Sequence, residues 1–205
     1  MKYDDYNIIP IGDHCAISIA LKELGLRTKS YPFDWVTHKK ELHDTNIIYN
    51  VNLIKDLETA SIKDIVNKYI GNAFENEDKI NNDKMNEANN ICFPHDSGTI
   101  TDIFEKYERR FNRLYLHIKT QKTIFILLTR HYYINENDFS YIMKILLGYN
   151  SDNIILFISG TDHPYLYEYE NVIFKHIWYD ITKFFNYDYT VFRPRLKEYF
   201  ATLFL

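Results

Sequence analysis

The chain has 205 residues, of which 46% are hydrophobic and 25% are charged; this composition is typical of one globular domain and excludes a wholly disordered chain. The formal net charge of −4 argues against a sequence-independent nucleic-acid binder, which needs a basic excess. No apolar run reaches the roughly 18 residues of a membrane span, and the N-terminal segment lacks the apolar region of a signal peptide. We therefore expect a single domain over residues 1–205 and a soluble, intracellular protein with no membrane and no nucleic-acid partner.

The first predicted unit is a strand, a tight turn and a helix. Residues 7–12 form a short apolar run that predicts a strand, and Pro10 favours an edge or irregular position for it. Apolar residues recur at helical spacing over residues 16–26, and Gly25 ends the helix. Cys15 lies in the turn between the strand and the helix.

The next part of the chain has weaker patterns. Residues 29–36 favour an extended or loop segment, and residues 42–68 contain two weak helical patterns. Residues 75–90 are dense in Asn, Asp, Glu and Lys, which predicts an exposed hairpin or a mobile loop. Residues 91–96 form a short apolar segment that ends in a polar pair.

A clear alternation of helices and strands begins at residue 101. An amphipathic pattern predicts a helix over residues 101–119, with Thr99 or Thr101 as its cap. The other predicted elements are strands at residues 123–129, 153–159 and 172–177 and helices at residues 139–147, 181–185 and 194–204. Apolar strands that alternate with amphipathic helices favour a covered parallel sheet. We therefore predict an α/β fold with three layers, in which a mainly parallel sheet has helices on both faces.

Polar side chains follow several of the predicted strands. They are Asp13 and His14 with Cys15, His95 with Asp96, Arg130 with His131, and Thr161 with Asp162 and His163. Because the sites of parallel α/β sheets lie at the carboxyl ends of the strands, these residues are candidates for one site. The alternative is that they are polar only because loops after buried strands usually are.

Cys15 is the strongest candidate for a nucleophile. At the start of a helix, free N–H groups and the helix dipole stabilise a thiolate, lower the thiol pKa and can hold an oxyanion. The alternative is a small buried residue that fills the corner between strand and helix. Cys92 lies between two apolar residues and is expected to be structural. Two cysteines without a CxxC pair form neither a disulfide framework nor a zinc finger.

A nucleophilic cysteine needs a base within hydrogen-bond reach. His95, His131 and His163 follow strand-like segments, and His95 has a carboxylate neighbour in Asp96. Of the remaining histidines, we expect His38, His43 and His117 to be solvated and His176 to be packed in the core. The histidines lack the spacing of metal ligands on one element, so no metal site is expected.

Residues 31–35, with the sequence YPFDW, form a second constellation. Either Asp34 and Trp35 form a wall of the pocket, or the two aromatic residues anchor the loop while Asp34 caps a helix. The basic side chains of the 101–119 helix are Lys106, Arg109, Arg110 and Arg113. They either bind an anionic ligand or form a solvated face paired with Glu105 and Glu108.

The segments IGDHC, SYPFDWV, FPHD, EKYERRFNRL and FILLTRH occur in this order. The set resembles a family of uncharacterised bacterial and large-DNA-virus proteins that are described as "putative papain-like cysteine peptidases". The resemblance covers residues 7–131. It implies that Cys15 is the nucleophile and His95 its partner, and that the protein acts in the host cytoplasm if its source is viral.

The Gly-x-x-Cys start also resembles capsule-polysaccharide acetyltransferases that bind coenzyme A, and SGNH hydrolases with Cys in place of Ser. One class of function is therefore a cysteine-dependent acyl enzyme, either a hydrolase without a cofactor or a coenzyme-A-dependent acyltransferase acting on a glycan. Its small-molecule, glycan or peptide substrate would contact Asp13, His14, Asp34, Trp35, Asp96, Arg130 and His131. Arg130 would hold an anionic part of that substrate. The other class is an inert α/β module that binds a partner in the same pocket.

Overall fold

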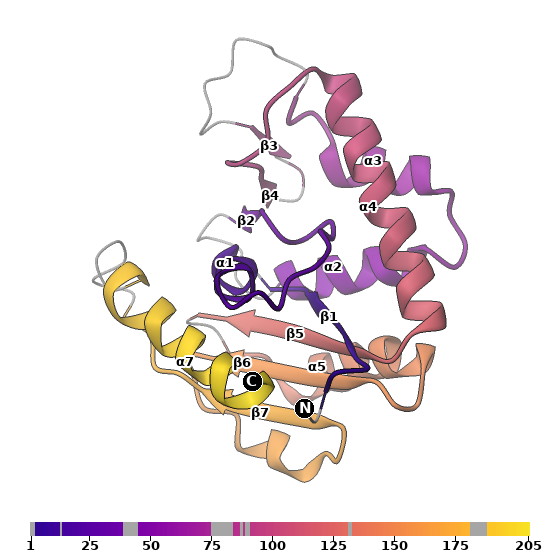
Figure 1. Cartoon of the computed structure of the whole chain (residues 1–205). Coiled ribbons are helices and arrows are strands. Elements are labelled where there is room, and N and C mark those ends of the chain that lie inside the picture. The colour runs from indigo at the N-terminus through magenta and orange to yellow at the C-terminus, as the bar shows by residue number, and fades with distance from the viewer. Residues whose placement is uncertain are drawn as a thin grey trace.

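The computed structural model describes residues 3–12, 14–38, 45–74, 84–86, 88, 91–130, 133–180 and 188–205. The predicted helix at residues 181–185 and most of the polar segment at residues 75–90 lie outside the described residues. Figure 1 shows the arrangement of the elements.

A parallel sheet of four strands forms the centre of the fold. Its strands are β1 (Asn7–Pro10), β5 (Thr123–Thr129), β6 (Ile154–Ser159) and β7 (Val172–His176), in the order β1-β5-β6-β7. Every neighbouring pair is parallel. The predicted parallel sheet is thus confirmed, and β1 lies at its edge, where the missing N–H of Pro10 is tolerated.

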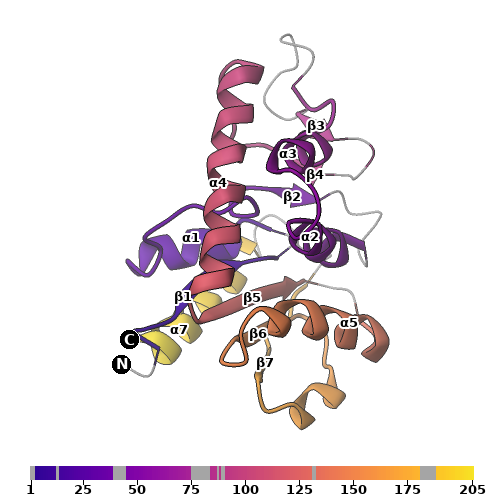
Figure 2. The ribbon, with the colours of Figure 1, turned by 90° about the vertical axis from the view of Figure 1, so that its right-hand side faces the viewer.

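Helices cover both faces of this sheet. The helices α1 (Ala16–Glu23) and α7 (Arg193–Phe204) pack on the face formed by alternate β5 residues such as Ile124 and Ile126. The other face, which includes Phe125 and Leu127, belongs to the core that also contains α2 (Thr45–Asp56), α3 (Ile62–Ile70), α4 (Ile100–Thr120) and α5 (Glu136–Leu146). Alternate residues of β5 point to opposite layers because the side-chain period of a strand is two. Figure 2 shows the sheet between these helical layers, so the predicted three-layer α/β fold is confirmed.

A small antiparallel sheet stands apart from the main one, near α3 and the start of α4 (Figure 1). It contains β2 (Thr37–His38), β4 (Ile91–Cys92) and β3 (Met85–Asn86) in the order β2-β4-β3. Its strands of two residues are too short to carry an alternating pattern, so the sequence does not predict this sheet. It joins the loop after residue 36 to the segment that precedes His95.

The long helix α4 begins with a capping box. The Thr99 hydroxyl accepts the N–H of Asp102, and the Asp102 carboxylate accepts the N–H of Thr99. These contacts satisfy N–H groups that lack an acceptor within the helix. Thr99 is therefore the cap, and the helix begins at Ile100.

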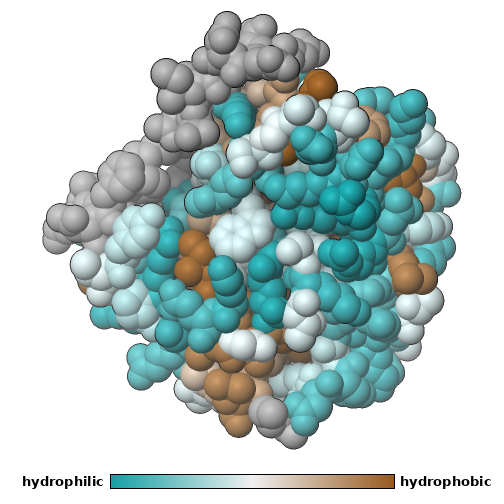
Figure 3. Space-filling view, turned by 45° about the horizontal axis from the view of Figure 1, so that its top comes forward, coloured by the Kyte–Doolittle hydropathy of each residue, from teal (hydrophilic) through white to brown (hydrophobic). Residues whose placement is uncertain are grey.

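The described residues also contain short helical turns. They are the 3-10 turns η1 (Leu147–Tyr149) and η2 (Pro164–Glu168) and the π-helical turn η4 (Asp188–Phe192), which leads directly into α7. Figure 3 shows a mostly hydrophilic face on which hydrophobic residues form only small, separate areas. Among the described residues, no helix combines the length and the apolar character needed to span a membrane.

Candidate functional site

The carboxyl ends of β1 and β5 place candidate residues at one edge of the main sheet. His14 and Cys15 follow β1, and Arg130 follows β5. The segments that follow β5 and β6 approach each other closely. A Cβ atom on Gly160, which follows β6, would lie only 1.9 Å from the carbonyl oxygen of Arg130. Only glycine fits at this position. This edge is where parallel α/β proteins build their sites.

Cys15 lies at the N-cap of α1 and is buried, with 6% of its surface exposed. Burial raises the pKa of its thiol, because the charged form is desolvated. The nearby Arg193 and Arg130 guanidinium groups act in the opposite direction, and Asp188 adds to the rise. A backbone hydrogen bond at the helix start lowers the pKa, as expected, but desolvation outweighs it together with the favourable charges.

His14 accepts a backbone hydrogen bond at the start of α1. Its Nδ1 atom accepts a hydrogen bond of 3.2 Å from the N–H of Ala16, so the proton of the neutral ring is on Nε2. Burial lowers the pKa of His14 well below its usual value, and the charges of Arg130, Arg193 and His95 lower it further. In this state, His14 has no free ring nitrogen with which to accept a thiol proton.

His95 lies against Trp35. Their rings meet edge-on with centroids 5.6 Å apart, and the guanidinium of Arg27 lies 4.8 Å from the centroid of the Trp35 ring. His95 is exposed, and its charge reaches His14. Within the described residues, no hydrogen bond joins Cys15 to His95. The pairing of these two residues therefore stays a prediction.

The Asp34 carboxylate is buried within its own loop. Its Oδ2 atom accepts hydrogen bonds from the Tyr31 N–H at 2.9 Å and from Arg27 Nη2 at 2.6 Å and Nε at 3.0 Å. It thus organises the turn at residues 31–35, and it caps this turn rather than a helix. Of the two expectations for this loop, the geometry favours a structural anchor, with Trp35 as the side chain that reaches His95.

Asp96 fastens the loop that carries His95 to α4. Its carboxylate accepts a hydrogen bond of 2.5 Å from the Tyr107 hydroxyl and forms an ion pair with Lys106. It is buried, with 3% of its surface exposed. No hydrogen bond joins Asp96 to His95 in the described part of the chain, so Asp96 holds the loop rather than the imidazole.

The inner face of α4 holds both loops. Arg113 Nη1 donates to the carbonyl of Ser30 at 2.6 Å, and His117 Nδ1 lies 2.7 Å from the Tyr31 hydroxyl. Arg110 is buried over the Tyr107 ring. The expected solvated position of His117 is therefore wrong, because the loop at residues 30–34 covers it.

The basic residues of α4 thus divide between two faces. Lys106 and Arg113 contact the loops, and Arg110 lies over the Tyr107 ring of the same helix. Arg109 is exposed and pairs with Glu105 at 3.8 Å. Neither an anion site nor a fully solvated face describes this helix. The segments with the sequences SYPFDWV, FPHD and EKYERRFNRL form one interlocked unit.

The other candidate bases differ in their availability. His163 is fully buried, with Nδ1 2.9 Å from the carbonyl of Thr161 and Nε2 accepting the N–H of Ile134 at 3.1 Å. Both of its ring nitrogens are engaged by backbone. His131 and Asp13 lie outside the described residues. The expected core position of His176 is wrong, because this residue ends the edge strand β7 and is exposed there, with Nε2 3.1 Å from the carbonyl of Gly160. His95 is therefore the described candidate whose ring is not held by the backbone.

A model of the family described as "Putative papain-like cysteine peptidase (DUF1796)" matches residues 6–139. The chain belongs to this family. This confirms the family that the sequence motifs suggested, and it supports a cysteine hydrolase in general terms. No curated protein and no solved structure matches the chain. The matched region contains Cys15, His95 and Arg130.

Two site residues lie beyond the region matched by the family and were not found by sequence analysis. Arg193, the first residue of α7, donates from Nε to Asp188 Oδ2 at 2.7 Å. Its charge reaches both Cys15 and His14. The sequence does contain an indication of this role. An arginine in the first turn of a helix is unfavourable because its charge opposes the helix dipole, so its presence there suggests a function.

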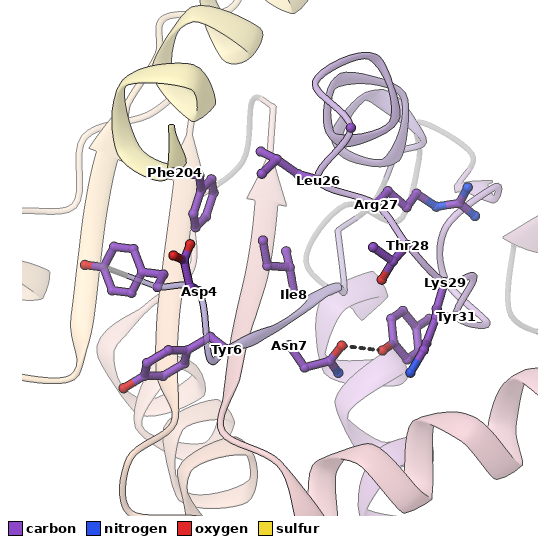
Figure 4. Close-up of a pocket in the computed structure, with 12 residues that line it drawn as sticks. Asp4, Tyr6, Asn7, Ile8, Leu26, Arg27, Thr28, Lys29, Tyr31 and Phe204 are labelled. Atoms are coloured by element: carbon purple, nitrogen blue, oxygen red, sulfur yellow. Dashed lines mark hydrogen bonds between the residues drawn. The ribbon is translucent and has the colours of Figure 1, made fainter. Parts of the chain in front are cut away.

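A separate cavity of about 320 Å³ lies at the opposite edge of the sheet. Figure 4 shows Asn7 and Ile8 at the start of β1, together with Leu26 and Phe204, around it. Cys15 precedes α1 and Leu26 follows it, and a helix of eight residues is about 12 Å long. This cavity is therefore not part of the Cys15 site.

Proposed function

We propose that the protein is a cysteine hydrolase in which Cys15 attacks the acyl carbonyl of a peptide, glycan or small-molecule substrate. The observation that carries this proposal is the position of Cys15. It lies between the carboxyl end of β1 and the start of α1, where the charges of two guanidinium groups favour its thiolate. Membership of a family described as cysteine peptidases supports the same chemistry.

In the proposed reaction, Sγ of Cys15 bonds to the carbonyl carbon and the thiol proton passes to His95. His95 then donates the proton to the leaving group, and water releases the acyl group from the thioester. The Ile17 and Ser18 N–H groups in the first turn of α1 lack intrahelical acceptors, so they would stabilise the oxyanion. Arg130 would hold an anionic part of the substrate.

The proposal requires His95 to move closer to Cys15 when substrate binds. Catalytic hydrogen bonds are often long in enzymes without substrate and form only in the complex. The exposure of His95 supports this requirement, since its ring contacts Trp35 rather than the buried core. Because Asp96 holds the base of the loop, the movement would involve the imidazole and not the whole segment.

Acylation by p-nitrophenyl acetate tests this function. We expect an acetyl thioester on Cys15, detected by mass spectrometry of the peptides, together with release of nitrophenolate. Cys15→Ala should abolish both, Cys92→Ala should change neither, and His95→Gln should slow acylation about 100-fold or more. Unchanged turnover in Cys15→Ala would contradict the proposal and favour an inert binding module. Acylation by acetyl-coenzyme A alone would favour the transferase.

A further inference from the structure

The start of α7 presents a guanidinium group in a fixed orientation. Asp188 holds Arg193 Nε at 2.7 Å, and the guanidinium carbon lies 4.1 Å from the centroid of the Tyr189 ring. Among the described residues, Nη1 and Nη2 have no hydrogen-bond partner. The Nε edge of the guanidinium is therefore bound to Asp188, and one face of it lies on Tyr189. The two Nη atoms, which together can bind a planar anion through paired hydrogen bonds, are not engaged.

The backbone that carries this group is unusual. Asp188, Tyr189 and Phe192 belong to the π-helical turn that precedes Arg193. Such turns are rare and are found mostly as single turns at functional sites. The turn brings both partners of the guanidinium, the carboxylate and the aromatic ring, to the same side of the first residue of α7.

Contacts with the segment that follows β7 bring this turn to the carboxyl edge of the sheet. The Phe192 ring meets Tyr179 with centroids 5.0 Å apart, and the Arg130 guanidinium lies 5.8 Å from the Tyr179 ring. The helices α1 and α7 pack on the same face of the sheet. Tyr179 thus links Arg130 to the start of α7, and the charges of Arg193 and Arg130 both act on Cys15.

We infer that Arg193 is a substrate-binding residue of the Cys15 site and selects substrates with a carboxylate or phosphate next to the group that Cys15 attacks. This inference rests on the proposed function and narrows its substrate class. The side chain of Arg193 is 14% exposed, so it is not sealed from a ligand. Its charge is the largest electrostatic influence that favours the Cys15 thiolate.

Two alkylating reagents that differ in charge test this inference at pH 8. Iodoacetate is an anion and iodoacetamide is neutral, and peptide mass spectrometry follows both at Cys15 with Cys92 as the internal reference. We expect the ratio of the iodoacetate rate to the iodoacetamide rate to be higher at Cys15 than at Cys92. Arg193→Gln should lower that ratio at Cys15 by about three- to tenfold, as expected for the loss of one nearby charge.

The matched control is Arg195→Gln, which removes an exposed arginine from the same helix and should leave the ratio unchanged. A ratio at Cys15 no higher than at Cys92, or one that is unaffected by Arg193→Gln, overturns the inference but leaves the proposed nucleophile in place. Resistance of Cys15 to both reagents, together with no acylation by p-nitrophenyl acetate, overturns the proposed function and the inference with it.

Protection of the unmodified protein provides a second measurement that does not depend on a variant that folds. Inorganic phosphate or acetate, compared with chloride at equal ionic strength, should slow the labelling of Cys15 by iodoacetamide at least about twofold. Stronger protection by phosphate indicates a phosphorylated substrate, and stronger protection by acetate indicates a carboxylate. The absence of protection by both anions contradicts the inference.

Discussion

Burial lowers the pKa of His14, His117 and His163 from its usual value, which favours the neutral form of each ring. His163 shows the reason most clearly. Its Nε2 accepts the N–H of Ile134, and its Nδ1 is directed at the Thr161 carbonyl. A second proton on this ring would place an N–H against an N–H, so the folded protein resists protonation of His163.

We expect acid to destabilise the protein through these histidines. Because their pKa values are lower in the folded than in the unfolded state, the unfolded chain binds protons first as the pH falls below about 6.5. The contribution of these histidines to the free energy of unfolding is therefore complete above that pH and is lost progressively below it. Urea unfolding at pH 7 and pH 5 should show a lower free energy of unfolding at pH 5. His163→Gln should reduce this difference by about 1 kcal/mol.

The control for this prediction is His176→Gln, which changes an exposed histidine at the end of β7. It should change the difference between pH 7 and pH 5 much less than His163→Gln does, because its charge is the smallest of the influences on the pKa of His163. An unfolding free energy that is equal at both pH values would show that the buried histidines do not control acid stability.

Among the elements, α4 connects the core to the candidate site. One stripe of the helix, including Phe111 and Leu114, is fully buried. Beside it, Lys106 and Arg113 contact the loops that carry His95 and Trp35. The same helix therefore stabilises the fold and sets the position of the predicted base.

We predict that Asp96→Ala destabilises the protein by about 2–3 kcal/mol, because Lys106 and the buried Tyr107 hydroxyl lose their acceptor. The partial exposure of Lys106 keeps the cost below that of a fully buried pair. Glu105→Ala breaks the exposed pair with Arg109 and should cost at most about 0.5 kcal/mol. Urea unfolding of the two variants measures the difference, and equal effects would contradict the role given to Asp96.

The whole molecule extends beyond the part that the family model matches. Residues 6–139 include β1 and β5 but neither β6 nor β7. Six residues of β5, from Ile124 to Thr129, pair with β6, and Phe200 of α7 is fully buried on the sheet. The matched region therefore contains only half of the strands of the main sheet.

A chain that ends at residue 150 should not fold cooperatively, because it exposes the edge of β5 and the apolar faces that β6 and α7 cover. We expect a broad thermal transition by circular dichroism and aggregation in size-exclusion chromatography. Removal of Leu205, which is exposed, is the control and should change the free energy of unfolding by less than about 0.5 kcal/mol. A sharp, monomeric transition for the short chain would contradict the prediction.

The sequence by itself determined the elements with strong periodicity. Apolar runs such as residues 123–129 could only be buried strands, and the stripe of α4 could only face a core, because burial of apolar surface dominates folding. The alternation of these elements determined the parallel three-layer sheet. It also determined that Cys15 lies between a strand and a helix, since that position depends only on neighbouring residues.

Only the tertiary structure decided which polar groups meet and what state they are in. The partners of Asp34, Asp96 and His117 come from loops and helices far apart in the sequence or from turns without periodicity. Likewise, Arg193 reaches the Cys15 site only because α7 packs beside α1. The pKa of the Cys15 thiol is higher than its position at a helix start suggests, because burial desolvates the thiolate. Burial depends on every group around the side chain, and the local sequence motif does not contain that information.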